Sequence, residues 1–308
     1  MSDQRDVKRP ALRSWAWWLL LTAAMLVMIA MHVGSALSSP NAVLLSADGD
    51  GLKNMFTYAW HAEHGNSLLH FSGSGDPYGD HIFYTDGHPP LAWLIQLMPW
   101  LKPWKVGLLN TLLLLAPLGC AWALFAIGRR WGMAPWAAAM AAFCISMLQP
   151  QIYRLGGHFA LAHCWMFPAI WYGLLRAGDE PKRWAWAFST GALVLLAMLV
   201  HPYLGMMSAL FVAALIGMRA LVKWEPLKQA RTYIEAGVMA VLPVVLFLAL
   251  ANASDRVADR PETPPGAEAY ATRWQSLLIS TQPPMSQWVH PLEPEGGLSW
   301  ESLCYVGI

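Results

Sequence analysis

Residues 15–36 read Trp15-Ala-Trp-Trp-Leu-Leu-Leu-Thr-Ala-Ala-Met-Leu-Val-Met-Ile-Ala-Met-His-Val-Gly-Ser-Ala36 and contain no Asp, Glu, Lys or Arg. About 20 apolar residues in a helix are enough to cross a hydrocarbon core roughly 30 Å thick. A segment in lipid must bond its own backbone N–H and C=O groups, so a single span has to be a helix. The run therefore predicts a transmembrane helix near the N-terminus.

Similar runs recur along the chain, which is 56% hydrophobic and only 13% charged, against about 25% charged in an average soluble domain. The first, second and seventh runs are long enough to span alone, and the other four need their polar flanks. We expect an all-α integral membrane protein with about seven transmembrane helices, at residues 15–36, 104–128, 133–148, 159–175, 184–200, 203–218 and 236–253.

The positive charges predict the orientation. With the N-terminus in the cytoplasm, 13 of the 20 Lys and Arg residues fall on the cytoplasmic side and 13 of the 19 acidic residues on the outer side, as the positive-inside rule requires. The first span could instead be a cleaved signal peptide, but its apolar core exceeds the usual 7–15 residues or so and no small-x-small site follows. We therefore interpret it as an uncleaved anchor.

Net charge and cysteine spacing exclude other classes. A formal net charge of +1 offers no electrostatic basis for nucleic-acid binding. Each of the four cysteines stands alone, without the CxxC spacing of a metal site or the pattern of a disulfide framework.

Polar residues concentrate in the long first outer loop, residues 38–103. It opens with Asp48 and Asp50, and apolar residues at helical spacing over 52–64 predict a helix lying in the membrane interface. Asp86 and His88 precede a second short helix expected at 91–101. Asp-Gly and His-Pro pairs are also ordinary turn formers. Six acids and five histidines between Asp48 and His88 nevertheless favour a functional site.

A second polar segment, residues 149–158, forms the turn between the third and fourth expected spans. Arg154 is the only Lys, Arg, Asp or Glu between Arg130 and Arg176, and such a residue beside the membrane core usually marks a ligand path or a specific partner. The following glycine pair could admit a phosphate at the next helix N-terminus. The alternative is that Arg154 only extends to the interface. His201, before a proline in the next outer turn, is interpreted as a turn residue.

In this arrangement the chain resembles the GT-C superfamily of membrane glycosyltransferases. The resemblance extends from the first span to the last residue. It rests on the cytoplasmic N-terminus, the acidic motif Asp48-Gly-Asp50-Gly-Leu-Lys-Asn54, the interfacial helices and His88-Pro-Pro-Leu91 before the second span. The segments 78–86 and 154–158 look like those of an uncharacterised bacterial subgroup. Residues 1–254 then correspond to the transmembrane domain, in the inner membrane of a bacterium.

The resemblance implies transfer of a sugar from a polyprenyl-phosphate carrier to a glycan, lipid or protein acceptor on the outer face. One carboxylate takes the acceptor's proton, and a cation stabilises the departing phosphate. By resemblance, the base is Asp50 or Asp48. Donor-phosphate contacts would be Arg154, His158 and Lys53, and substrate contacts Asp86 and His88. Asp48 and Asp50 could instead hold a divalent cation, since hard cations prefer carboxylate oxygens.

Two alternatives stay open. The chain could be a lipid or solute transporter, although its spans show neither interior acid–base pairs nor an obvious repeat. It could also be a non-catalytic relative that binds lipid-linked sugar. Residues 255–308 are expected to form an outer loop or tail, and the final residues resemble the entry into another membrane helix.

Overall fold

The computed structural model describes residues 14–46, 49–65, 67–75, 77–148, 154–178, 183–222 and 230–255. Asp48 and nearly all of the expected outer segment 255–308 lie outside these residues. The described residues belong to one compact unit, Met1–Arg256.

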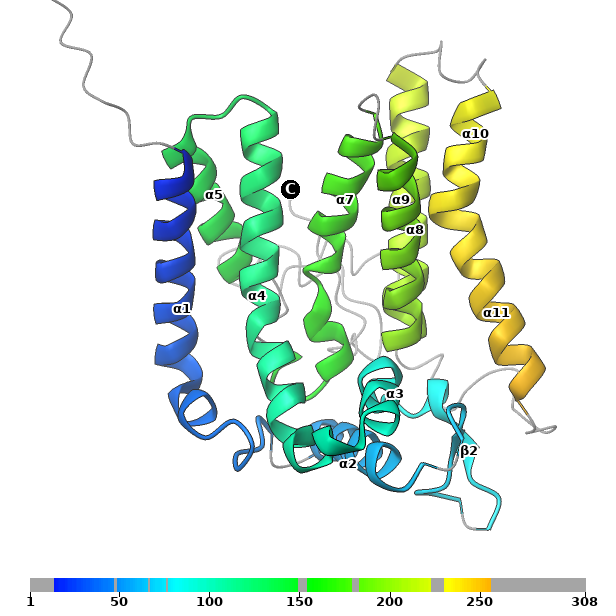
Figure 1. Cartoon of the computed structure of the whole chain (residues 1–308). Coiled ribbons are helices and arrows are strands. Elements are labelled where there is room, and N and C mark those ends of the chain that lie inside the picture. Colours follow the sequence, from blue (N-terminus) through cyan, green and yellow to red (C-terminus); the bar gives the residue numbers. More distant parts are fainter. Residues whose placement is uncertain are drawn as a thin grey trace, which may run out of the picture. The chain divides into compact units, whose positions relative to one another are not determined.

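The predicted α-helical architecture is confirmed (Figure 1). In the described part of the chain, five helical segments are long and apolar enough to cross a membrane. They comprise α1 (Ser14–Ser38), α4 (Lys105–Arg130) with the 3₁₀ turn η2 (Pro99–Trp104), α8 (Arg183–Val200), α9 (Pro202–Val222), and α10 (Ala230–Ala236) with η5 (Gly237–Val241) and α11 (Leu242–Ser254).

The other two expected spans are helical but short. Helix α5 covers Pro135–Leu148, and the segment expected at 159–175 divides into the 3₁₀ helix η3 (Phe159–His163) and α7 (Met166–Ala177). A helix rises about 1.5 Å per residue, so 14 and 12 residues give only about 21 and 18 Å. The count of seven spans stays a prediction.

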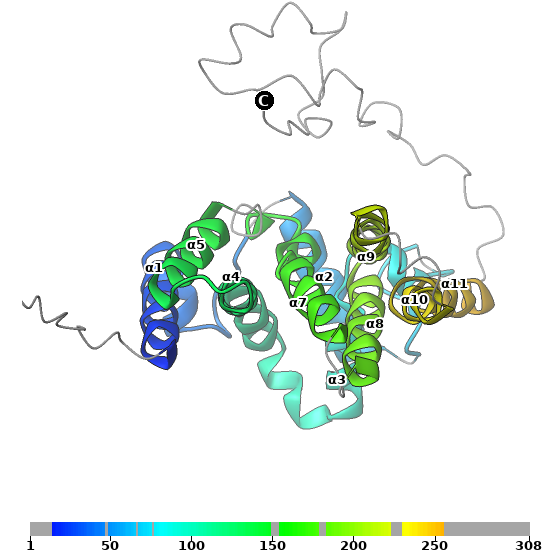
Figure 2. The same ribbon diagram turned by 90° about the horizontal axis from the view of Figure 1, so that it is seen from above.

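The helices pack as two neighbouring groups (Figures 1 and 2). One group joins α1, α4 and α5 around a core that includes Met25 and Ala121. The other joins α7, α8, α9 and α11 around Ile170, Val194 and Met239. Small residues permit the closest approaches in the second group: a Cβ on Gly191 would lie 2.4 Å from the Val238 carbonyl oxygen. That carbonyl belongs to the π-helical turn η5.

The long loop at residues 38–103 folds at one end of the bundle, the lower end in Figure 1. It contains α2 (Gly49–His64), the antiparallel pair β1 (His70–Phe71) and β2 (Asp80–His81), η1 (Ile82–Tyr84) and α3 (Pro89–Leu97). Both expected helices are present. Helix α2 buries Asn54, Tyr58 and His61 against the protein, whereas Leu52 and Phe56 of the apolar stripe are each 46% exposed.

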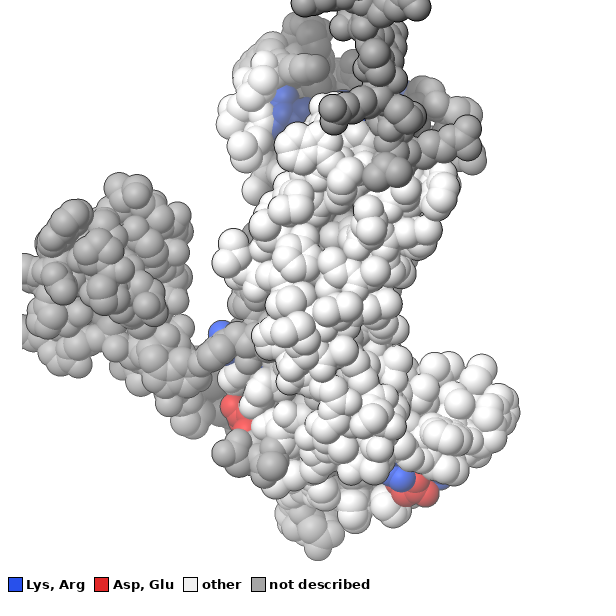
Figure 3. All heavy atoms as spheres, turned by 90° about the vertical axis from the view of Figure 1, so that its left-hand side faces the viewer, with Lys and Arg blue, Asp and Glu red and all other residues white. Residues whose placement is uncertain are grey.

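Charged side chains lie toward the two ends of the described bundle. On the face seen in Figure 3 they occur near the top and in the lower part, with a broad uncharged area between them. At the upper end of Figure 1, where α8 and α10 begin, the Arg183 guanidinium pairs with the buried carboxylate of Glu235. The lower end carries the groups described next.

Candidate functional site

The first side chains of the site come from the start of α2. Gly49 has φ +49°, a left-handed conformation that glycine adopts without strain. Asp50 follows in the first turn of the helix, where the helix dipole favours a negative charge. Lys53 lies one turn later, with its Nζ 3.8 Å from Asp50 Oδ1. The helix start therefore presents a carboxylate and an ammonium side by side.

The turn at residues 154–158 packs directly against this helix start. Ser46 Oγ donates to the Gly156 carbonyl at 3.0 Å, and Asn54 Nδ2 donates to the Gly157 carbonyl at 2.9 Å. These contacts place His158 Nε2 3.6 Å from Asp50 Oδ2. Two segments about 100 residues apart in the chain thus form one side of a single site.

Arg154 stands at the start of the same turn, where its carbonyl accepts the Gly157 N–H at 3.1 Å. That hydrogen bond occupies a backbone donor that the glycine pair was expected to offer to a phosphate. The helix that follows is also only the five-residue η3. Side chains, rather than the glycine backbone, therefore supply the basic groups that face Asp50.

Asp86 forms the inner part of the site. Its Oδ2 is 3.0 Å from Lys53 Nζ, and its Oδ1 is 2.9 Å from His201 Nε2. Burial alone would raise the pKa of the Asp86 carboxyl, but the hydrogen bonds from His201 and Lys53 outweigh it and lower that pKa to about 2. Burial alone would also lower the pKa of Lys53, and its pairing with Asp86 and Asp50 raises it. The two groups therefore stay charged at neutral pH.

His88 is buried behind this pair. Its Nε2 lies 3.0 Å from His163 Nε2. His163 Nδ1 accepts the Trp165 Nε1–H at 3.2 Å, so neutral His163 carries its proton on Nε2 and donates it to His88. Neutral His88 then carries its own proton on Nδ1, which has no hydrogen-bond partner in the described part of the chain. Burial, with His163 and His201 nearby, holds the pKa of His88 well below its ordinary value.

The structure thus brings together Asp50, Lys53, His158 and Asp86, with His88 in the layer beneath. Two further residues belong here that sequence reasoning did not assign. His201 does lie in a turn, as interpreted, but it also binds Asp86; His163 was not singled out. The sequence did offer one indication for His163. It lies inside a predicted span, where burying a histidine costs free energy unless the ring has a hydrogen-bond partner.

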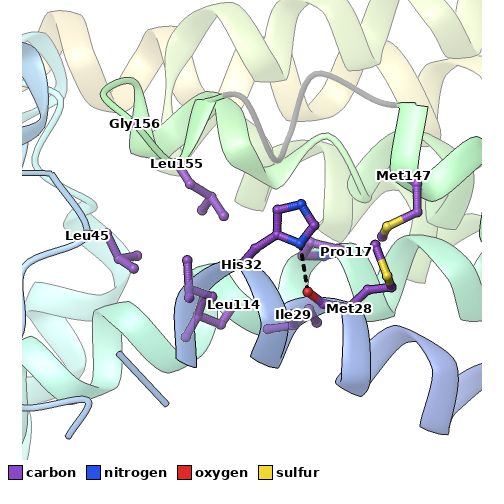
Figure 4. A pocket seen from close by; sticks show the side chains of 10 residues that line it. Met28, Ile29, His32, Leu45, Leu114, Pro117, Met147, Leu155 and Gly156 are labelled. Carbon is purple, nitrogen blue, oxygen red and sulfur yellow. Dashed lines mark hydrogen bonds between the residues drawn. The ribbon is translucent and has the colours of Figure 1, made fainter. Parts of the chain in front are cut away.

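An apolar pocket of about 250 Å³ adjoins the site (Figure 4). Side chains of α1, α4 and α5 line it, and Leu155 and Gly156 close it on the side of the 154–158 turn. His32 of α1 also lines the pocket, and its Nδ1 lies in hydrogen-bond contact with the Met28 carbonyl at 2.8 Å. One turn therefore presents Leu155 to an apolar pocket and His158 to Asp50.

Side chains that could bind a metal do not cluster in the described residues. No group of three or more His, Cys, Asp or Glu side chains among them is arranged to hold an ion. The two oxygens of Asp50 face Lys53 and His158, basic groups that compete with a cation. The suggested pairing of Asp50 with Asp48 falls partly outside the described residues.

Residues 19–308 match the family described as "Domain of unknown function (DUF6311)". The match covers most of the chain, so the protein belongs to this family. No curated protein and no solved structure shows significant similarity to the chain.

Proposed function

We propose that this protein is a membrane glycosyltransferase that moves a sugar from a polyprenyl-phosphate donor to an acceptor on the outer face. The observation that carries the proposal is the Asp50 carboxylate, flanked by Lys53 and His158 within 3.8 and 3.6 Å. An inverting displacement from a phosphate requires a carboxylate to take the acceptor's proton and a cation or hydrogen-bond donor to stabilise the departing phosphate. The apolar pocket beside the 154–158 turn would accommodate part of the lipid carrier.

In this mechanism an Asp50 oxygen accepts the proton of the acceptor hydroxyl as the acceptor oxygen attacks the anomeric carbon. The bond from that carbon to the phosphate oxygen breaks, and the phosphate leaves with the electron pair. Lys53 and His158 would hold it, with Arg154 at the start of the same turn. No general acid is needed, because a phosphate whose second pKa is about 6 leaves as an anion.

Asp50 suits the role of base better than Asp86. The Asp50 side chain is 48% exposed and can reach an acceptor, whereas Asp86 is 30% exposed and lies between Lys53 and His201. The lowered pKa of Asp86 also makes it a weak proton acceptor. Asp86 therefore anchors Lys53, while Asp50 performs the proton transfer.

The proposed placement is in the inner membrane of a bacterium, with the N-terminus in the cytoplasm. The described helix α4 ends with Arg129 and Arg130, at the end opposite α2 and α3 in Figure 1. Basic residues at that end favour the cytoplasmic side. The site would then face the outer side, where lipid-linked sugars are used by enzymes of the GT-C type.

The test uses the full-length protein in lipid nanodiscs, incubated with a panel of polyprenyl-phosphate sugars and an extract of candidate acceptors. Mass spectrometry follows donor consumption in the wild type, Asp50→Asn and the matched control Glu63→Gln. Glu63 lies on the same helix but pairs with Lys105 at 3.1 Å, outside the site. We expect consumption to disappear only in Asp50→Asn. Donor binding without consumption in all three proteins would refute transfer.

That refuting result would favour the second candidate, a protein that binds or moves a lipid-linked substrate without transferring it. The apolar pocket is the observation that favours this candidate, because an apolar lining can bind a lipid chain without any catalytic group. Under this alternative, Asp50→Asn would change substrate binding and leave the bound substrate intact.

A further inference from the structure

His201 and His163, which sequence reasoning did not assign to the site, reach it from other parts of the chain. His201 lies in the turn between α8 and α9, and the Tyr203 N–H donates to its Nδ1 at 3.2 Å. The proton of neutral His201 is therefore on Nε2, directed at Asp86 Oδ1. His163, at the end of η3, is directed in the same way at His88. Each histidine is oriented by one neighbour and donates a hydrogen bond to one residue of the turn at residues 86–88.

The turn that they contact has an unusual backbone. Asp86 has φ +58° and His88 has φ +45°, and these are the two described residues other than glycine with positive φ. Such conformations are costly for residues with a Cβ, and they persist only where the surroundings hold them. His88 also precedes Pro89, which restricts its backbone further. Two strained residues are thus each held by a histidine from another part of the chain.

The turn at residues 86–88 determines where the Lys53 side chain lies. Lys53 is a long, mobile side chain that is 54% exposed, and its shortest ion pair is the 3.0 Å contact with Asp86. Its distance to Asp50 is longer, at 3.8 Å. If Asp86 moved, the ammonium would lose its closest partner. The Asp86 carboxylate therefore fixes Lys53 close enough to Asp50 for both to meet one ligand.

We propose that His201 and His163 are positioning residues, which act through Asp86 and His88 to hold the turn at residues 86–88 and thereby the Lys53 ammonium beside Asp50. The role of Lys53 as a phosphate contact rests on the proposed function. The positioning of Lys53 does not require sugar transfer, and neither does its test. The competing possibility is that the Lys53–Asp86 pair maintains itself without either histidine.

The test measures how fast a water-soluble N-hydroxysuccinimide ester acylates Lys53 in the full-length protein in nanodiscs, with mass spectrometry as the readout. His201→Leu removes the N–H donor to Asp86, and His201→Gln keeps a donor at a similar reach. Lys102 and Lys105, which pair with Glu63 on the far part of α2, serve as internal references. Unchanged labelling of these two lysines shows that the loop has kept its fold.

We expect Lys53 labelling to rise roughly 1.5- to fivefold in His201→Leu, the range for losing a partly exposed ion pair. It should stay near the wild-type rate in His201→Gln, and His163→Leu should raise it as His201→Leu does. Unchanged labelling in both Leu variants would overturn the proposal. An equal rise in His201→Gln and His201→Leu would also overturn it, because the donor would then not matter.

A measurement on the wild-type protein covers the case in which a Leu variant does not fold. Nitrogen-15 NMR of labelled histidines distinguishes the two neutral tautomers. The proposal requires the proton on Nε2 in His201 and His163, and on Nδ1 in His88. A different tautomer at His201 or His163 would remove the donor that the argument needs and would refute it, whatever the outcome of the donor-consumption assay.

Discussion

Replacing Asp86 with Asn should destabilise the folded protein in a pH-dependent manner. The substitution keeps the side-chain shape but removes the charge that pairs with Lys53 at 3.0 Å and His201 at 2.9 Å. The drop in the Asp86 pKa from its ordinary 3.8 to about 2 corresponds to roughly 2 kcal/mol, since one pKa unit is worth about 1.36 kcal/mol. Solvent screening at a side chain that is 30% exposed reduces this to about 1–2 kcal/mol.

The sign of the pH dependence follows from the direction of the shift. A carboxyl whose pKa is lower in the folded state contributes its full stabilisation above the unfolded pKa, here 3.8, and loses it as the pH falls through the folded value of about 2. The wild type should therefore exceed Asp86→Asn in unfolding free energy by a constant amount near pH 7. That difference should fall by about half at pH 3.

The assay is denaturant unfolding in mixed micelles, followed by tryptophan fluorescence at pH 7, 5 and 3. Glu63→Gln is the matched control. Its carboxylate also pairs with lysines but is 37% exposed, so its loss should cost at most about 1 kcal/mol. Equal stability of Asp86→Asn and wild type at pH 7 would refute the reasoning. So would a difference that remains undiminished at pH 3.

Three other measurements test separate parts of the structure. Gly191→Ala should destabilise the protein by about 1–3 kcal/mol in the same unfolding assay, because the new methyl group would lie 2.4 Å from the Val238 carbonyl oxygen; an unchanged midpoint would show that the helices can separate without cost. His88 should keep its neutral nitrogen-15 NMR shifts from pH 8 to pH 5, since burial holds its pKa well below the ordinary value, and titration near pH 6.5 would contradict the buried pair. Met147→Trp should fill part of the 250 Å³ pocket and reduce the co-purifying lipid detected by native mass spectrometry, and undiminished lipid would place the lipid contact elsewhere.

Much of the helical architecture could be predicted because lipid imposes a simple physical rule. A charge-free apolar run that crosses a bilayer alone must be a helix, so the segments that form α1, α4, α8, α9 and α11 could be recognised in the sequence. The shorter segments were harder to predict. In the run at 159–175, the 3₁₀ helix η3 ends at His163. Hydropathy does not predict which hydrogen-bond partner stabilises this histidine when it is buried.

The site could be predicted only as separate pieces. Asp50, Lys53 and Asp86 were recognisable as polar residues in the long loop at residues 38–103, and His158 as part of a turn between two expected spans. His201 was interpreted as a turn residue, because a histidine before a proline has no sequence feature that names its hydrogen-bond partner. Its contact with Asp86 joins residues 115 positions apart, and only the packing of the loop at residues 38–103 against the second helix group brings them together.

The sequence alone determined the helical character of the chain, its apolar runs and the two segments that hold most of the polar residues. Each of these depends only on local composition and on the spacing of apolar residues. Tertiary structure alone decided which of those polar groups meet. Hydrogen bonds from Ser46 and Asn54 bring the 154–158 turn to Asp50. The strained backbone at Asp86 is held by contacts with residues from other parts of the chain, His201 among them. Such contacts depend on side-chain positions across the fold, which no local pattern in the chain encodes.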